Sequence, residues 1–135
     1  MKIERFEDIV AWQEARILTK RVYDLCSDGA FVKDFGLKDQ IQRASVSINA
    51  NISEGFDSRS RLEFVKFLGY ANRSGSETQS HLYVALDQKY ITERQFGETY
   101  NEAAFTKKLI GGFVRYLKEG PNRSTAALQH RSTNY

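Results

Sequence analysis

One stretch of the sequence, residues 64–85, constrains the fold more than any other. Its apolar and small side chains recur at alternating spacings of four and three, and they are Phe64, Leu68, Ala71, Gly75, Thr78, Leu82 and Ala85. Such an alternation, kept over three heptads, is the period of a helix in a left-handed bundle. We therefore predict a helix over residues 61–88 whose apolar face must be covered by other helices.

Three further segments have the same amphipathic period, and they are residues 8–27, 37–54 and 93–118. A connection of about nine residues, with two glycines and no sustained period, separates the first two. Amphipathic helices joined by short connections can bury their apolar faces only against one another. The predicted fold is all-α, an antiparallel, left-handed, up-and-down four-helix bundle over residues 1–118. Past Gly120 and Pro121 the period stops, and we expect a flexible tail at 119–135.

The overall composition fits one globular domain, because 135 residues with 41% apolar side chains can bury a sizeable core. No segment approaches the roughly 20 apolar residues that span a bilayer, and the first residues lack a signal peptide's apolar run. The lone cysteine, Cys26, fits a reducing compartment and a packed rather than catalytic side chain. We expect a soluble, cytoplasmic protein.

The polar stretch SINANISEGFDSRSRLEF, residues 47–64, has the pattern of a helix stop, a turn and a helix start. Gly55 is predicted to end the helix over 37–54 in a left-handed conformation. Ser60 and Glu63 have the spacing of a capping box, as do Thr92 and Gln95 at the start of the last helix. Pairing the two helices about a turn near residue 57 or 58 sets Ala44 opposite Ala71.

Two residues of this stretch are open to a structural or a functional reading. Asn51 falls at or beside a core position, where an amide must find hydrogen-bond partners, and a satisfied structural role is favoured over a ligand contact. Glu54 faces the negative end of the helix dipole, so we expect Arg59 to pair with it.

The chain resembles the 23S rRNA intervening sequence proteins, a family of four-helix-bundle proteins. The resemblance rests on WQEA at 12–15, QRASVSINANISEG at 42–55, SRSRLEFVKFLGYA at 58–71 and KYIT at 89–92. It implies a bundle that assembles into pentameric rings, and no catalytic activity comes with it. More distantly, the chain is similar to accessory proteins of diversity-generating retroelements, which are thought to bind nucleic acid. The motif positions are Arg43, Asn51, Glu54, Gly55, Arg59, Glu63, Ser74 and Glu77, and each has a purely structural alternative.

We expect a non-enzymatic oligomer that binds RNA or another nucleic acid through basic surfaces, and the oligomer is what the resemblance implies. The charge distribution permits a polyanionic partner without requiring one. Residues 101–135 hold six Lys or Arg against two glutamates, although basic residues also complement the end of a helix dipole. The candidate binding residues are Arg43, Arg59, Arg61, Arg73, Lys107, Lys108, Arg115 and Lys118.

The alternative function is a protein-binding scaffold or accessory subunit without direct nucleic-acid contact. Exposed aromatic residues such as Trp12 and Tyr70 would serve that role. An enzyme is the least favoured class, because the sequence has neither a phosphate-binding glycine loop nor His, Cys or carboxylate residues at metal-ligand spacing. We therefore expect no cofactor and no metal.

Overall fold

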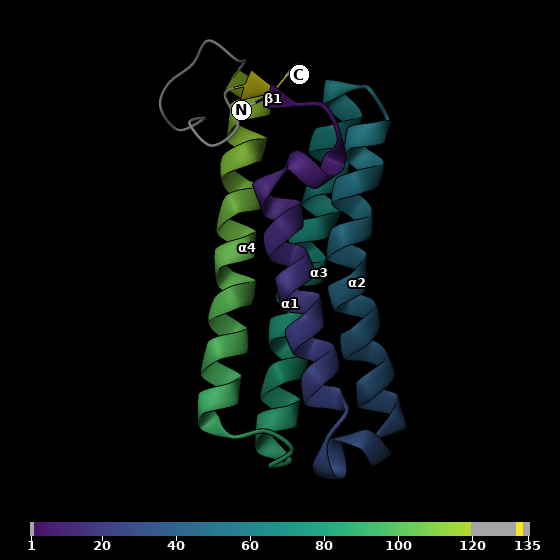
Figure 1. Cartoon of the computed structure of the whole chain (residues 1–135), viewed down its shortest axis with the longest axis vertical. Coiled ribbons are helices and arrows are strands. Elements are labelled where there is room, and N and C mark those ends of the chain that lie inside the picture. Colours follow the sequence, from purple (N-terminus) through teal and green to yellow (C-terminus); the bar gives the residue numbers. More distant parts are fainter. Residues whose placement is uncertain (1, 120–131, 134–135) are drawn as a thin grey trace.

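A computed structural model describes residues 2–119 and 132–133, and it contains four long helices within them (Figure 1). The helices are α1 Val10–Cys26, α2 Phe35–Asp57, α3 Arg61–Asp87 and α4 Glu93–Glu119. The 3-10 helix η1 Phe6–Asp8 precedes α1, and η2 Gly29–Lys33 follows it. Two short strands, β1 Lys2–Ile3 and β2 Ser132–Thr133, pair in parallel.

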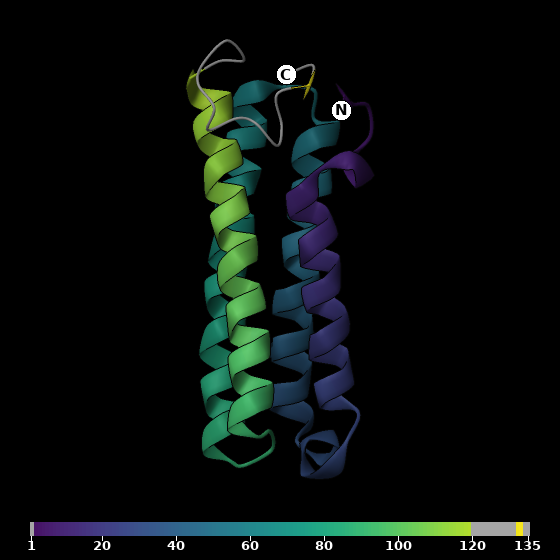
Figure 2. The same ribbon diagram turned by 60° about the vertical axis from the view of Figure 1, so that its left-hand side comes forward.

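Successive helices run in opposite directions and pack side by side, and α1 also packs against α4 (Figures 1 and 2). The predicted all-α, antiparallel four-helix bundle is confirmed. The α2–α3 turn, the end of α4 and the N-terminal segment lie at one end of the bundle, and the other two connections lie at the opposite end (Figure 1). In the described part of the chain, no helix has the length and apolar character needed to cross a membrane.

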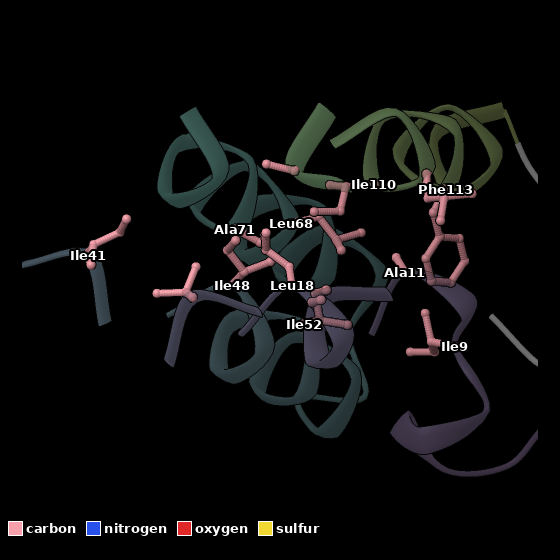
Figure 3. Packing of buried hydrophobic residues seen from close by; sticks show 14 of the residues in the cluster. Ile9, Ala11, Leu18, Ile41, Ile48, Ile52, Leu68, Ala71, Ile110 and Phe113 are labelled. Atoms are coloured by element: carbon pink, nitrogen blue, oxygen red, sulfur yellow. The ribbon is translucent and has the colours of Figure 1, made fainter. Parts of the chain in front are cut away.

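The core forms where the apolar stripes of all four helices meet. Every residue of the predicted α3 stripe, from Phe64 to Ala85, is buried. Leu18 of α1, Ile48 and Ile52 of α2 and Ile110 of α4 belong to the same buried cluster (Figure 3). Burying one such side chain fully contributes roughly 1.5–3 kcal/mol, so these stripes supply the main driving force for the fold.

The connection between α1 and α2 is more ordered than the sequence suggested. It contains η2, whose Phe31 is buried and stacks on Tyr90 with ring centroids 5.2 Å apart. Asp34 then caps α2 by accepting a hydrogen bond from the backbone N–H of Leu37 at 3.1 Å. Because this cap precedes Phe35, α2 begins two residues before the predicted Leu37.

The predicted end of α2 is wrong, and Gly55 is not its stop. The helix continues through Gly55 to Asp57, and the residue with left-handed backbone is Arg59, with φ 58°. Gly55 is buried against α3, where a Cβ would stand 2.7 Å from Cδ1 of Phe64 and 2.9 Å from Cβ of Phe67. The glycine is thus required by close helix packing and not by backbone conformation.

The longer α2 also changes the register of the α2–α3 pair. Ser74 Oγ donates to Ser47 Oγ at 2.9 Å, which places residue 47 level with residue 74. Ala44 shares a surface hollow with Glu77, so the predicted pairing of Ala44 with Ala71 is also wrong. The turn between α2 and α3 therefore lies two to three residues later in the sequence than the turn predicted from a helix that stops at Gly55.

The structure describes α4 as far as Glu119, and residues 120–131 lie outside the described part of the chain, so the domain boundary expected at residue 118 stays a prediction. The predicted flexible tail at 119–135 lies outside the described residues, except for Glu119 and the strand β2.

Candidate functional site

The corner between α2 and α3 is built by short-range hydrogen bonds. Ser60 Oγ accepts the N–H of Glu63 at 3.2 Å, which caps α3 as its sequence indicates. The return bond of a full capping box is replaced, because the N–H of Ser60 donates to Ser58 Oγ at 3.3 Å. Glu63 instead lies 3.7 Å from Lys66 Nζ. The hydroxyl groups of Ser58 and Ser60 are therefore occupied in fixing the turn.

Arg59 does not form the expected ion pair with Glu54. Its guanidinium lies over the ring of Phe56, 4.8 Å from the ring centroid, and the backbone carbonyl of Glu54 accepts the N–H of Ser58 at 3.1 Å. None of the ion pairs between described residues joins Glu54 to Arg59. The left-handed backbone of Arg59 thus presents an exposed cation at the tip of the turn.

Four exposed cations gather at this end of the bundle, and we call them the basic end. They are Arg59 in the turn, Arg61 at the start of α3, and Arg115 and Lys118 in the last turns of α4. Arg61 Nη1 donates to the backbone carbonyl of Leu117 at 2.9 Å, which ties the start of α3 to the end of α4. Arg61 and Lys118 flank a hollow of about 330 Å³ whose apolar wall includes Leu62, 80% exposed.

The other four predicted cations lie elsewhere on the bundle. Arg43 Nε is 2.9 Å from Asp39 Oδ2, so its charge is locally offset. The guanidinium of Arg73 lies 5.6 Å from the ring centroid of Tyr70. Lys107 is half-buried, with Nζ donating to Gln79 Oε1 at 3.1 Å, and Lys108 is exposed on α4. The eight candidates therefore do not form one surface.

Asn51 has a structural role in the α2–α3 seam. Its Nδ2 donates to the carbonyl of Ser47 at 2.8 Å and to Ser47 Oγ at 3.0 Å. Ser47 Oγ also accepts a hydrogen bond from the hydroxyl of Ser74, so Ser47 links the motif residues Asn51 and Ser74 in one hydrogen-bonded chain. Glu77, in contrast, is exposed and lines a hollow of about 270 Å³ with Arg43.

Sequence reasoning missed a second surface, which we call the α1–α2 groove. It is a hollow of about 540 Å³ between α1 and α2, lined from α1 by Trp12, Arg16, Thr19, Lys20 and Tyr23 and from α2 by Val46 and Asn49. Tyr23 and Val46 are both 43% exposed. A second hollow of the same volume adjoins it on the outer face of α1, is lined by α1 residues and contains Ile17, 44% exposed. The signal was present in the sequence, because Ile17 and Tyr23 interrupt the polar face of the first helix.

Two titratable groups have displaced pKa values. Burial, followed by the neighbouring carboxyl of Glu14, raises the pKa of Glu102 to about 7, and Arg21 opposes this increase. Burial raises the pKa of the Cys26 thiol to about 11, which disfavours a nucleophilic thiolate. Within residues 2–119, no cluster of three or more His, Cys, Asp or Glu side chains is placed to hold a metal ion.

Comparison with known proteins identifies the family but not an activity. A crystal structure from Bacteroides thetaiotaomicron, of a protein of unknown function from the S23 ribosomal protein family, superimposes with a TM-score of 0.74 at 27% identity. The match covers 80% of this chain and 97% of that one. No functionally curated protein matches. The family model of the 23S rRNA-intervening sequence protein matches residues 7–112, and the chain belongs to this family.

Proposed function

We propose that the protein is a non-enzymatic, cytoplasmic homo-oligomer that binds RNA through the basic end. The single observation that carries the proposal is the convergence of Arg59, Arg61, Arg115 and Lys118 from the turn, the start of α3 and the end of α4. Exposed guanidinium and ammonium groups recognise phosphate oxygens, and they impose little sequence preference.

Oligomerisation would strengthen such binding without more charge on each subunit. The resemblance described above implies a pentamer, in which the basic end is repeated five times around a ring. Repeated weak contacts raise the overall affinity through effective concentration. A mass measurement in solution tests this part, because a subunit of 15.5 kDa forms a pentamer of about 78 kDa. A 15.5 kDa species at micromolar concentration would exclude it.

The binding test is fluorescence anisotropy with a labelled single-stranded RNA at several salt concentrations. The double variant Arg59→Gln, Lys118→Gln removes two charges but keeps the Arg61 bond to α4. We expect the slope of log K against log salt to decrease by about 1.4 for each engaged subunit, at about 0.7 per phosphate contact. The proposal fails if the unaltered protein does not bind RNA at low salt.

A matched control separates the basic end from general charge. Lys89→Gln combined with Arg94→Gln also removes two exposed cations, but near the α3–α4 connection at the opposite end of the bundle. This control should leave the salt slope unchanged. Equal losses in both double variants would show that net charge governs binding and would contradict an interface at the basic end.

A second candidate function is a protein-binding scaffold, and the α1–α2 groove is the observation that favours it. Soluble proteins seldom leave grouped apolar side chains exposed without a partner. The two functions differ in salt response, because a contact made mainly by apolar side chains persists at salt concentrations that dissociate phosphate contacts.

A further inference from the structure

The α1–α2 groove has an apolar floor and a cationic edge. Tyr23 of α1 and Val46 of α2 supply apolar surface, and both are 43% exposed. Arg16 and Lys20 line the groove, Arg21 lies in the adjoining hollow on α1, and among the described residues no acidic side chain lines either hollow. A partner that fits this surface therefore combines apolar side chains with negative charge.

The groove has the length of a short helix. Trp12 and Tyr23 mark its two ends on α1, and eleven residues at 1.5 Å each span about 16 Å, or three helical turns. Two parallel ridges formed by neighbouring helices accept a third helix between them, with its apolar residues at i, i+3, i+4 and i+7. A hydrogen bond fixes the two helices to each other along the groove, because Thr19 Oγ1 of α1 lies 2.7 Å from the side-chain amide of Asn49 on α2.

Two of the cations have acidic neighbours outside the groove. Lys20 Nζ is 2.6 Å from Asp24 Oδ1, in a pair whose side chains are both more than 60% exposed. Such an exposed pair contributes little, so a partner's carboxylate can replace it at small cost. Arg21 also faces Glu102 of α4. Arg16 has no ion pair with a described residue and is the principal free charge.

Nucleic acid fits this groove less well than a helix does. Bases bind by stacking on exposed flat ring faces. Trp12, at one end of the groove, is half-buried and packs edge-on against Phe6 with centroids 5.2 Å apart, and Val46 gives the floor an aliphatic side chain. The floor therefore suits branched aliphatic or aromatic side chains inserted from above.

We propose that the α1–α2 groove binds an acidic amphipathic helix of a partner protein. This inference deepens the second candidate function, the scaffold, and it is independent of RNA binding at the basic end. The partner helix places apolar side chains over Tyr23 and Val46 and carboxylates beside Arg16 and Lys20.

The experiment uses the full chain and a 15-residue helical peptide without tryptophan, with Leu at i, i+3, i+4 and i+7 and Glu at most other positions. Trp12 is the only tryptophan of the protein, so its emission reports directly on the groove. We expect the peptide to shift this emission to shorter wavelength in a saturable manner. A matched peptide with Lys in place of Glu should bind at least about tenfold more weakly.

Two valine variants supply the control. Val46→Asp places a negative charge, the same sign as that of the Glu peptide, in the floor of the groove. Val84→Asp makes the same change on α3, at a site with the same 43% exposure. Val46→Asp should weaken acidic-peptide binding about tenfold or more, and Val84→Asp less than about twofold. Circular dichroism verifies that both remain folded.

Three results would overturn the proposal: equal binding of the Glu and Lys peptides, equal effects of the two valine variants, or a Trp12 response to single-stranded RNA but not to the acidic peptide. The last result would identify the groove as a nucleic-acid surface. The double variant Arg59→Gln, Lys118→Gln should bind the peptide normally, so failure of the groove and failure of the basic end are measured separately.

Discussion

Replacing Gly55 with alanine tests whether α2 and α3 touch as closely as the structure places them. A Cβ at this position would stand 2.7 Å from Phe64 Cδ1, about 0.7 Å inside the 3.4 Å at which ordinary contact begins. The other close atom, Cβ of Phe67, is fixed to the α3 backbone at 2.9 Å and cannot rotate away. Either the helices separate locally or Phe64 leaves its position in the core.

The magnitude follows from comparison with a second glycine. Gly69 is an exposed interior residue of α3, and a Cβ there would meet no atom of the described residues within 4 Å. Both substitutions gain about 0.5–1 kcal/mol from helix propensity, so Gly69→Ala should stabilise the protein by that amount. Gly55→Ala also bears an overpacking cost of about 1–3 kcal/mol. The difference between the two variants isolates this packing cost.

Urea denaturation followed by circular dichroism, at one fixed protein concentration, measures both free energies of unfolding. With an m value of about 2 kcal/mol/M, the two midpoints should differ by about 0.5–1.5 M. Fixed concentration is needed because subunit association would add to the apparent stability. If Gly55→Ala were as stable as Gly69→Ala, the close contact would not exist and the register of the α2–α3 seam would be refuted.

Two further predictions concern the raised pKa values of Glu102 and Cys26. The pKa of Glu102 is about 7 in the folded protein, against an ordinary 4.5. Because the folded state binds this proton more tightly, protonation of Glu102 stabilises the fold. The stabilisation is complete below pH 4.5 and is lost as the pH rises through 7. Thermal unfolding between pH 5 and 8 should show this loss, and it should disappear in Glu102→Gln; an unchanged pH profile in the variant would contradict the assignment. Cys26, with a buried thiol of pKa about 11, should react with a disulfide reagent at pH 8 only after denaturant is added, so rapid reaction of the native protein would refute its burial.

The helices could be predicted because their information is local. Successive residues of the α3 stripe lie one helical turn apart. Thr92 and Gln95, whose reciprocal hydrogen bonds measure 3.0 and 2.9 Å, are also only three residues apart. Gly55 was misread for a definite reason. A glycine required by left-handed backbone and one required by a neighbouring helix have the same sequence letter, and only the position of Phe67 distinguishes them.

The candidate sites were harder to predict, because a charged residue reveals no position until the helix register is known. The bond from Arg61 to the carbonyl of Leu117 joins residues 56 positions apart, and no sequence spacing indicates it. Four of the eight candidate cations come together only through such long-range packing. Lys107 likewise bonds Gln79, 28 positions away, whereas Arg43 has a partner, Asp39, one turn away on its own helix. The apolar floor of the α1–α2 groove likewise requires Val46 to be set beside α1.

The position of the N-terminal segment has a practical consequence for handling the protein. β1 and η1 lie at the same end of the bundle as the α2–α3 turn and the end of α4 (Figure 1). A fluorescent fusion or an affinity tether attached at residue 1 would crowd Arg59 and Arg61 and compete with any macromolecule approaching them. Labels placed instead at the α3–α4 connection, for example at Lys89, would leave that end clear and orient an immobilised sample with its cations facing the solution.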